Sequence, residues 1–225
     1  ENGLVNREER RPELPSFLPS PAPSSDNFES PVLKYCWNTI HPPVQSFYSL
    51  TERPGCLRLY LRPEVLHEIC TPAFIGRRQQ HAAFLMQAAL DFTPMENCEE
   101  AGLALVQDDR FHYTYTVTKK GNERLLKLSA VRMGCPALLK EAPLPASGRI
   151  YLTVTASREG YHFYYGMTDQ EFLPFFTNAD PTLLSSLTNE GFTGTYLGMY
   201  ASSNHQDSNN YADFDWFLYE PLRQQ

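Results

Sequence analysis

The 225-residue sequence lacks the features that define several common classes of protein. No apolar run approaches the roughly 20 residues that a membrane-spanning helix requires, so a membrane protein is not expected. Cysteine is scarce, with five residues and no C-x-x-C pair, so a zinc–thiolate site is not indicated. No N-x-S/T glycosylation sequence occurs. We expect buried, reduced cysteines, which slightly favours the cytoplasm over secretion as the location.

Positive charge is also in short supply. The formal net charge is −7, whereas binding to a nucleic-acid backbone requires a basic surface, so nucleic acid is excluded as a partner. The sequence contains no P-loop, no G-x-G-x-x-G, no H-E-x-x-H and no G-x-S-x-G nucleophile elbow. With 42% hydrophobic and 13% aromatic residues, the chain can still form one large core.

Proline is concentrated at the start of the sequence. Residues 1–25 contain prolines at positions 12, 15, 19, 21 and 23, mixed with serine and charged residues. Such a composition favours an extended arm or linker and opposes a helix. The first residues, Glu1-Asn2-Gly3, read as an internal stretch of a longer protein. We therefore divide the sequence into an arm, 1–25, and a globular part, 26–225.

The globular part shows the period-two alternation of half-buried strands. Residues 111–117, "FHYTYTV", alternate aromatic with polar side chains, and a turn at 119–122 precedes a second strand at 124–131. Residues 149–157 and 161–167 form another such pair around a Glu-Gly turn. Many short strands at regular spacing predict an all-β protein, an antiparallel β-sandwich.

One short helix is expected near residue 180. Asp180 is a suitable N-cap, Pro181 suits the first helical position, and leucines 183, 184 and 187 follow at helical spacing before Gly191.

The stretch "GRRQQHAAFLMQAALDF", residues 76–92, combines a polar start with an apolar strand. Read as one continuous strand, it places its even-numbered residues, including Arg78, on the core face and Arg77, Gln79 and His81 on the opposite face. Salt bridges and amide contacts to nearby loops would explain these residues. They could also dock a ligand or a partner surface.

Carboxylates near the two ends of the globular part could bind a cation. In "YADFDWFLYEP", Asp213 and Asp215 share one face of a strand, with Phe214 and Trp216 on the other. Because first and last strands often pair in sandwiches, Asp26 or Glu29 could complete an oxygen-rich calcium site. Plain edge-strand charges would explain the same pattern. Elsewhere, Glu99 and Glu100 are expected in a solvated turn, and His112 and His162 are expected on strand faces as plain surface or cross-strand residues.

Five stretches occur together in a fixed order: "SLTERPGCLRLYL", "GRRQQHAAF", "LDFTPMENCEEAGLALVQ", "GFTGTYLGMYAS" and "ADFDWFLYEP". Over residues 26–221 the set resembles the C-terminal domain of family-43 glycoside hydrolases, the β-xylosidases and α-arabinofuranosidases. The resemblance implies a concanavalin-A-like sandwich without a catalytic triad of its own, because the essential carboxylates of that family lie in a separate five-bladed propeller. It also implies that Phe192 reaches the rim of the sugar pocket, and that Arg77, Arg78, Gln79 and His81 face the propeller.

Three functions remain open from the sequence. The first is a non-catalytic accessory domain that packs on a catalytic propeller in the breakdown of xylan or arabinoxylan. The second is a stand-alone carbohydrate-binding module that holds xylan-type polysaccharide on exposed aromatic rings. The third is an independent hydrolase with sandwich-borne carboxylates, although none of the 26 acidic residues lies in a pattern that marks a proton donor. The sequence leaves open whether the chain alone has any activity.

Overall fold

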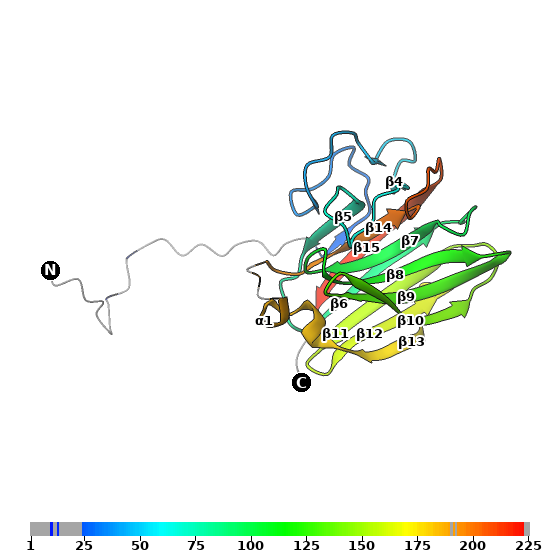
Figure 1. The fold of residues 1–225 in the computed structure, drawn as a ribbon. Helices are drawn as coiled ribbons and strands as arrows, with labels where there is room; N and C mark the ends of the chain where they lie inside the picture. The colour runs from blue at the N-terminus through cyan, green and yellow to red at the C-terminus, as the bar shows by residue number, and fades with distance from the viewer. Residues whose placement is uncertain (1–9, 11–12, 14–23, 190, 192, 223–225) are drawn as a thin grey trace.

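The structure, a computed structural model, describes residues 10, 13, 24–189, 191 and 193–222. These residues form two antiparallel sheets that pack face to face, with one short helical segment at one end (Figure 1). None of the helices in the described part of the chain is long and apolar enough to cross a membrane. The prediction of an antiparallel β-sandwich is confirmed, whereas the arm expected over residues 1–25 lies almost entirely outside the described residues.

The first sheet has eight strands. In spatial order these are β13 (Leu173–Ala179), β12 (Gly160–Gly166), β11 (Ile150–Ser157), β6 (Phe84–Asp91), β15 (Tyr211–Pro221), β4 (Leu57–Tyr60) and β3 (Tyr48–Ser49), with β1 (Ser25–Asp26) also paired to β15. The second sheet has seven strands: β10 (Cys135–Pro143), β9 (Glu123–Arg132), β8 (Phe111–Lys120), β7 (Glu100–Val106), β14 (Tyr196–Ser202), β5 (Ala73–Arg78) and β2 (Asn38–Thr39).

The core lies between the inner faces of the two sheets. The alternation along β8 directs Tyr113 and Tyr115 inward, where they meet Phe163 of β12 with ring centroids 5.9 and 5.2 Å apart. Edge-on aromatic contacts of this kind add roughly 0.5–1.5 kcal/mol each beyond the burial of apolar area. Both predicted hairpins, β8–β9 and β11–β12, are present. In the second hairpin Gly160 has a φ of 143° and leaves no room for a Cβ beside the carbonyl of Ala179.

The helical segment consists of two single turns, a 3-10 turn η1 (Pro181–Leu184) followed by α1 (Ser186–Asn189). Asp180 caps it as predicted, since its Oδ1 accepts a hydrogen bond of 2.8 Å from the Thr182 amide. Leu183 and Leu184 are buried against the sandwich, but Leu187 is 92% exposed. The segment therefore carries an unburied apolar side chain at this end of the molecule.

The expected continuous strand over 76–92 is wrong. Residues 73–78 form β5 in the seven-stranded sheet, residues 84–91 form β6 in the eight-stranded sheet, and 79–83 cross from one sheet to the other. The odd-numbered residues of β5 face the core, whereas on β6 the even-numbered residues do. Arg77 therefore points into the sandwich, where it is 4% exposed, and Arg78 points outward. The predicted faces of these two arginines are reversed.

The outer face of the seven-stranded sheet is covered in part, which the period-two pattern of the sequence does not predict. Leu66, from the connection between β4 and β5, packs there against Phe74, Val106 and Tyr200. His112 on the same face is only 1% exposed, so of the two expected positions it takes the cross-strand one, between β7 and β9, and not the surface one. Burial lowers the pKa of His112 to about 4, and its Nδ1 donates a hydrogen bond of 3.2 Å to the carbonyl of Asp108.

Candidate functional site

The crossing loop 79–83 is organised by one hydroxyl group from another strand. Tyr219 Oη of β15 accepts hydrogen bonds from the amides of Gln80 and His81, at 2.9 and 3.0 Å, and lies 3.1 Å from His81 Nδ1. Since both lone pairs of the hydroxyl are used by the amides, its proton is donated to His81 Nδ1. The His81 ring is thereby oriented with Nε2 as its N–H.

A buried glutamine fixes the neighbouring segment. Gln107 follows β7, and its Nε2 donates to the carbonyl of Thr193, with a second contact of 3.2 Å to Thr193 Oγ1. Its Oε1 accepts a hydrogen bond of 2.9 Å from Thr195 Oγ1. Gln79 joins the same network, because its backbone N–H donates to the Thr195 carbonyl at 2.9 Å. The segment 193–195 is therefore held between the ends of β5 and β7.

Two hollows meet at Gln107 and Thr193. The first, of about 410 Å³, is lined by the crossing loop, the helical segment and residues 193–195. The second, of about 430 Å³, lies over the seven-stranded sheet and is mainly apolar, with Ile40, Leu66 and Phe74 in its wall. We call the two hollows together the docking face.

Exposed apolar and cationic groups border the docking face. Ile69, in the wall of the second hollow, is 87% exposed, and Leu187 projects from the helical segment beside the first. Arg78 lies on the outer surface with its guanidinium carbon 4.9 Å from the ring centre of Tyr196, its neighbour on β14. Exposed large apolar side chains at a mainly apolar hollow, with polar and cationic groups at its edge, are typical of a site that binds another protein surface.

Comparison with known proteins shows which family shares this sequence and fold. A family model described as the β-xylosidase C-terminal concanavalin A-like domain matches residues 25–220. The chain belongs to that family. The chain is 36% identical in sequence, over 98% of its length, to a non-reducing end α-L-arabinofuranosidase of Bacteroides ovatus. It is 34% identical, over 87% of its length, to a xylosidase/arabinosidase of Butyrivibrio fibrisolvens.

Solved structures agree with the sequence relatives. A Bacteroides ovatus GH43B protein superimposes with a TM-score of 0.86 over 94% of this chain, at 34% identity. A xylan β-1,4-xylosidase from Bacillus halodurans gives the same TM-score over 93% of the chain, at 30% identity. The domain spans only 41% and 37% of the two sequence relatives, so it corresponds to the C-terminal part of these longer enzymes.

The structure brings together three of the four predicted docking residues. Arg78, Gln79 and His81 lie along one edge of the docking face, between β5 and the crossing loop. Arg77 is separated from them because it points inward, with its guanidinium carbon 4.9 Å from the ring centre of Tyr219. Phe192, the predicted residue of the pocket rim, lies outside the described residues.

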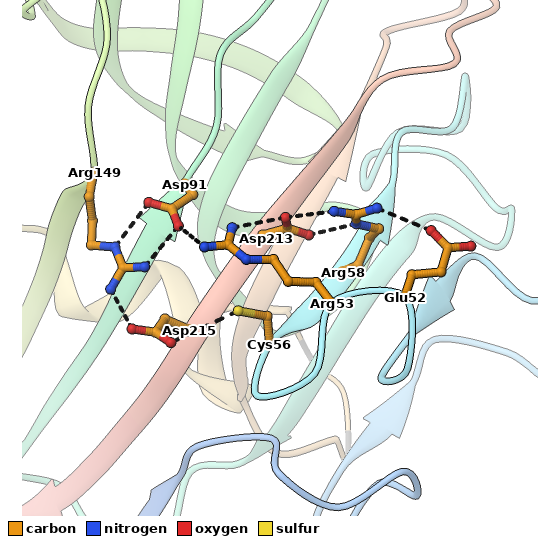
Figure 2. A network of polar contacts seen from close by, with 8 residues as sticks. All are labelled: Glu52, Arg53, Cys56, Arg58, Asp91, Arg149, Asp213 and Asp215. Carbon is orange, nitrogen blue, oxygen red and sulfur yellow. Dashed lines mark hydrogen bonds and ion pairs between the residues drawn. The ribbon is translucent and has the colours of Figure 1, made fainter.

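The predicted metal residues Asp213 and Asp215 lie in a network of arginines (Figure 2). Arg58 binds both oxygens of Asp213 through Nε and Nη2, at 2.7 and 2.9 Å, and Arg53 adds a contact of 3.0 Å. Arg53 continues to Asp91, which is also bound by Arg149 at 2.9 and 2.8 Å. Arg149 reaches Asp215 in turn, so strands β4, β6 and β15 are joined by alternating charges.

This network bears on the calcium prediction. The arginines occupy the oxygen atoms that a cation would need, and the Arg149 guanidinium, with Arg53 beside it, holds the pKa of Asp91 below its usual range. Glu29 is exposed, and among the described residues no group of three metal-binding side chains includes it, Asp213 or Asp215. Calcium at these three residues stays a prediction that the described geometry does not favour.

Two residues of the candidate site were missed in the sequence. Gln107 could have been noticed as a polar residue directly after the apolar run 101–106, where an amide ends a buried strand. Tyr219 gave no such signal, because its position depends on a β-bulge between Phe214 and Trp216. The bulge turns Trp216 outward, against the prediction that it shares a face with Phe214, and sets its ring 6.1 Å from that of Tyr151.

Proposed function

We propose that this domain is a non-catalytic part of a family-43 glycosidase that releases terminal xylosyl or arabinofuranosyl residues from xylan-type substrates. Its role is to pack on a catalytic domain through the docking face and to complete one side of that domain's sugar pocket. The observation that supports this most directly is the convergence of two hollows, one mainly apolar, on the contact between the buried Gln107 and Thr193. A surface of this kind suits a fixed domain junction better than free solvent.

The position of the 193–195 segment supports the assignment of the pocket rim. Gln107 fixes Thr193 and Thr195 beside the first hollow, so the described chain is anchored on the docking face at Thr193. In our proposal the aromatic side chain of Phe192 extends from this point to the rim of the sugar pocket. The propeller architecture of the catalytic partner is part of the same proposal.

The arginine–aspartate network supports a non-catalytic role. Glycoside hydrolysis needs a carboxylic acid that is protonated at working pH and a second carboxylate roughly 5–10 Å away. The grouped carboxylates of the network are bound by arginines, and the pKa of Asp91 is lowered rather than raised. A lowered pKa keeps the group ionised, so Asp91 is unsuited to the role of proton donor.

The decisive experiment is a chimera. The C-terminal domain of the Bacteroides ovatus α-L-arabinofuranosidase is replaced by this chain, and hydrolysis of nitrophenyl arabinofuranoside and xyloside is measured. We expect the chimera to be active and this chain alone to be inactive. Substitution of Gln107 by Ala in the chimera should lower kcat/KM, whereas Lys120→Ala, on the exposed end of β8 and away from both hollows, should not. An active isolated chain, or a chimera indifferent to Gln107→Ala, contradicts the proposal.

A stand-alone carbohydrate-binding module is the second candidate. One observation favours it: Tyr151 and Trp216 form an aromatic pair on the outer face of the eight-stranded sheet, where a sugar ring could stack. Calorimetric titration of the chain with xylo-oligosaccharides separates the two functions. A heat of binding that disappears in Trp216→Ala supports the binding module, and the absence of any heat of binding supports the accessory domain.

A further inference from the structure

Three side chains that could bind a metal meet at a loop junction remote from the arginine–aspartate network. His67 and Glu68 lie between β4 and β5, and His205 lies in the turn after β14. One ligand atom from each of the three lies within 4.8 Å of the others, and Glu68 Oε1 is 3.7 Å from His205 Nε2. In the described part of the chain, this is the one such group of three.

The backbone around the three residues is held firmly. Ser202 Oγ lies 3.1 and 3.0 Å from the carbonyls of Arg62 and Glu64, which share its one proton, and the His205 amide donates to the Pro63 carbonyl at 2.9 Å. These hydrogen bonds fix the turn after β14 against the start of the β4–β5 connection. The ligand-bearing backbone is therefore organised before any ion binds, which limits the conformational entropy lost on binding.

We propose that His67, Glu68 and His205 bind a divalent transition metal of the zinc class. Two imidazoles and one carboxylate are a donor set for zinc, cobalt or nickel, whereas calcium requires six to eight oxygens. A tetrahedral ion at about 2.1 Å from each ligand separates the ligand atoms by about 3.4 Å, so the side chains must move closer by roughly 1 Å. Such rotations are accessible, because the side chains of Glu68 and His205 are 49% and 55% exposed.

Binding would tie a wall of the docking face to the sandwich. Glu68 and Ile69 line the mainly apolar hollow, and His205 belongs to a turn anchored on the seven-stranded sheet. A metal bridging Glu68 and His205 therefore fixes the loop that carries Ile69. The site would act as a structural clamp, with water completing the coordination of the ion.

The test uses the 225-residue chain, free of any polyhistidine tag and stripped with EDTA. Zinc chloride is titrated by calorimetry, and cobalt chloride is followed by its visible absorption, which intensifies when hexaaqua cobalt enters a four- or five-coordinate site. We expect one saturable zinc site and no heat from calcium chloride. His67→Ala and His205→Asn should each weaken zinc binding at least tenfold, since loss of even an outer-shell partner costs roughly 10–100-fold.

Controls keep the result interpretable. Asn tolerates the left-handed backbone of residue 205, where φ is 67°, so His205→Asn should fold normally, and melting temperatures in EDTA verify this for each variant. His162→Ala removes an imidazole from β12 in the other sheet and should leave zinc affinity unchanged. Absence of a saturable site, or equal zinc affinity in the parent chain, His67→Ala and His205→Asn, would overturn the proposal.

Discussion

The substitution Asp213→Asn tests whether the arginine–aspartate network stabilises the fold. Asp213 is the most buried member of the network, with a side chain 4% exposed, and it accepts three hydrogen bonds from two guanidinium groups. Asparagine has nearly the same shape, but it removes the charge and turns an N–H group toward Arg58. The guanidinium of Arg58, 14% exposed, then loses its buried counter-ion.

The structure sets the size of the expected effect. Removing one partner of a fully buried ion pair costs about 3–5 kcal/mol. The Arg58–Asp213 pair comes close to that case, because its side chains are 14% and 4% exposed and are joined by two parallel hydrogen bonds. Arg53, with a side chain 41% exposed, adds little, because water screens its contact. We therefore expect a loss of about 3 kcal/mol in the free energy of unfolding, the lower end of that range. For a chain of this size the loss corresponds to a fall in Tm of about 6–12 °C.

Urea unfolding followed by tryptophan fluorescence measures this change. Arg58→Lys should give an intermediate loss, since lysine keeps the charge but cannot form the two parallel hydrogen bonds. Glu52→Gln, at the exposed end of the network, should leave the urea midpoint unchanged. A loss for Asp213→Asn below about 1 kcal/mol, the value of a solvent-exposed pair, would refute the reasoning.

Three further predictions concern groups outside the network. Tyr219→Phe removes the hydroxyl that binds two amides of the crossing loop, so we expect these amides to exchange hydrogen faster by NMR and the fold to lose about 1 kcal/mol. The pKa of His112 is about 4 in the folded chain and about 6.5 when unfolded, so the unfolded state binds more protons between these values. The free energy of unfolding should accordingly fall by about 3 kcal/mol as pH drops from 6.5 to 4, whereas His112→Asn, whose amide can replace the Nδ1 donor, should show a flatter pH profile. Among the cysteines, all of which are free, exposed Cys135 should react first with a thiol reagent, and Cys56 should react slowly because burial raises its thiol pKa; equal rates would contradict the described burial.

The sequence predicted the elements whose local patterns agree with their tertiary surroundings. The β8–β9 and β11–β12 hairpins and the helical segment capped by Asp180 all combine side-chain periodicity with a turn or cap signal. The sandwich itself follows from such elements, because half-buried strands must bury one face against another sheet. In these places one-dimensional reasoning is sufficient.

Predictions from the sequence pattern are wrong where the burial of a side chain depends on segments distant in sequence. Glu99 was expected in a solvated turn, but its carboxylate is buried and accepts hydrogen bonds from the Met95 amide, Ser208 Oγ and Asn210 Nδ2. His112 was expected as a surface or cross-strand residue, and the β4–β5 connection, which covers it, rules out the surface position. Ser208, Asn210 and the β4–β5 connection are all distant in sequence from the residue that they cover, so periodicity carries no information about them. The expectation that the cysteines are buried failed similarly, since only Cys56 of the five is fully buried.

The bulge in β15 determines which side chain of the strand reaches the crossing loop. With strict alternation after Phe214, which is buried, Trp216 and Leu218 would face inward and Tyr219 outward. The extra residue at the bulge reverses this pattern, so Asp215 and Trp216 both face outward while Tyr219 points inward. Asp215 would face outward and meet Arg149 with strict alternation as well, whereas the shift after the bulge is what brings the Tyr219 hydroxyl under the crossing loop. Because a one-residue shift exchanges the two faces of a strand, the position of the crossing loop at the docking face depends on this bulge.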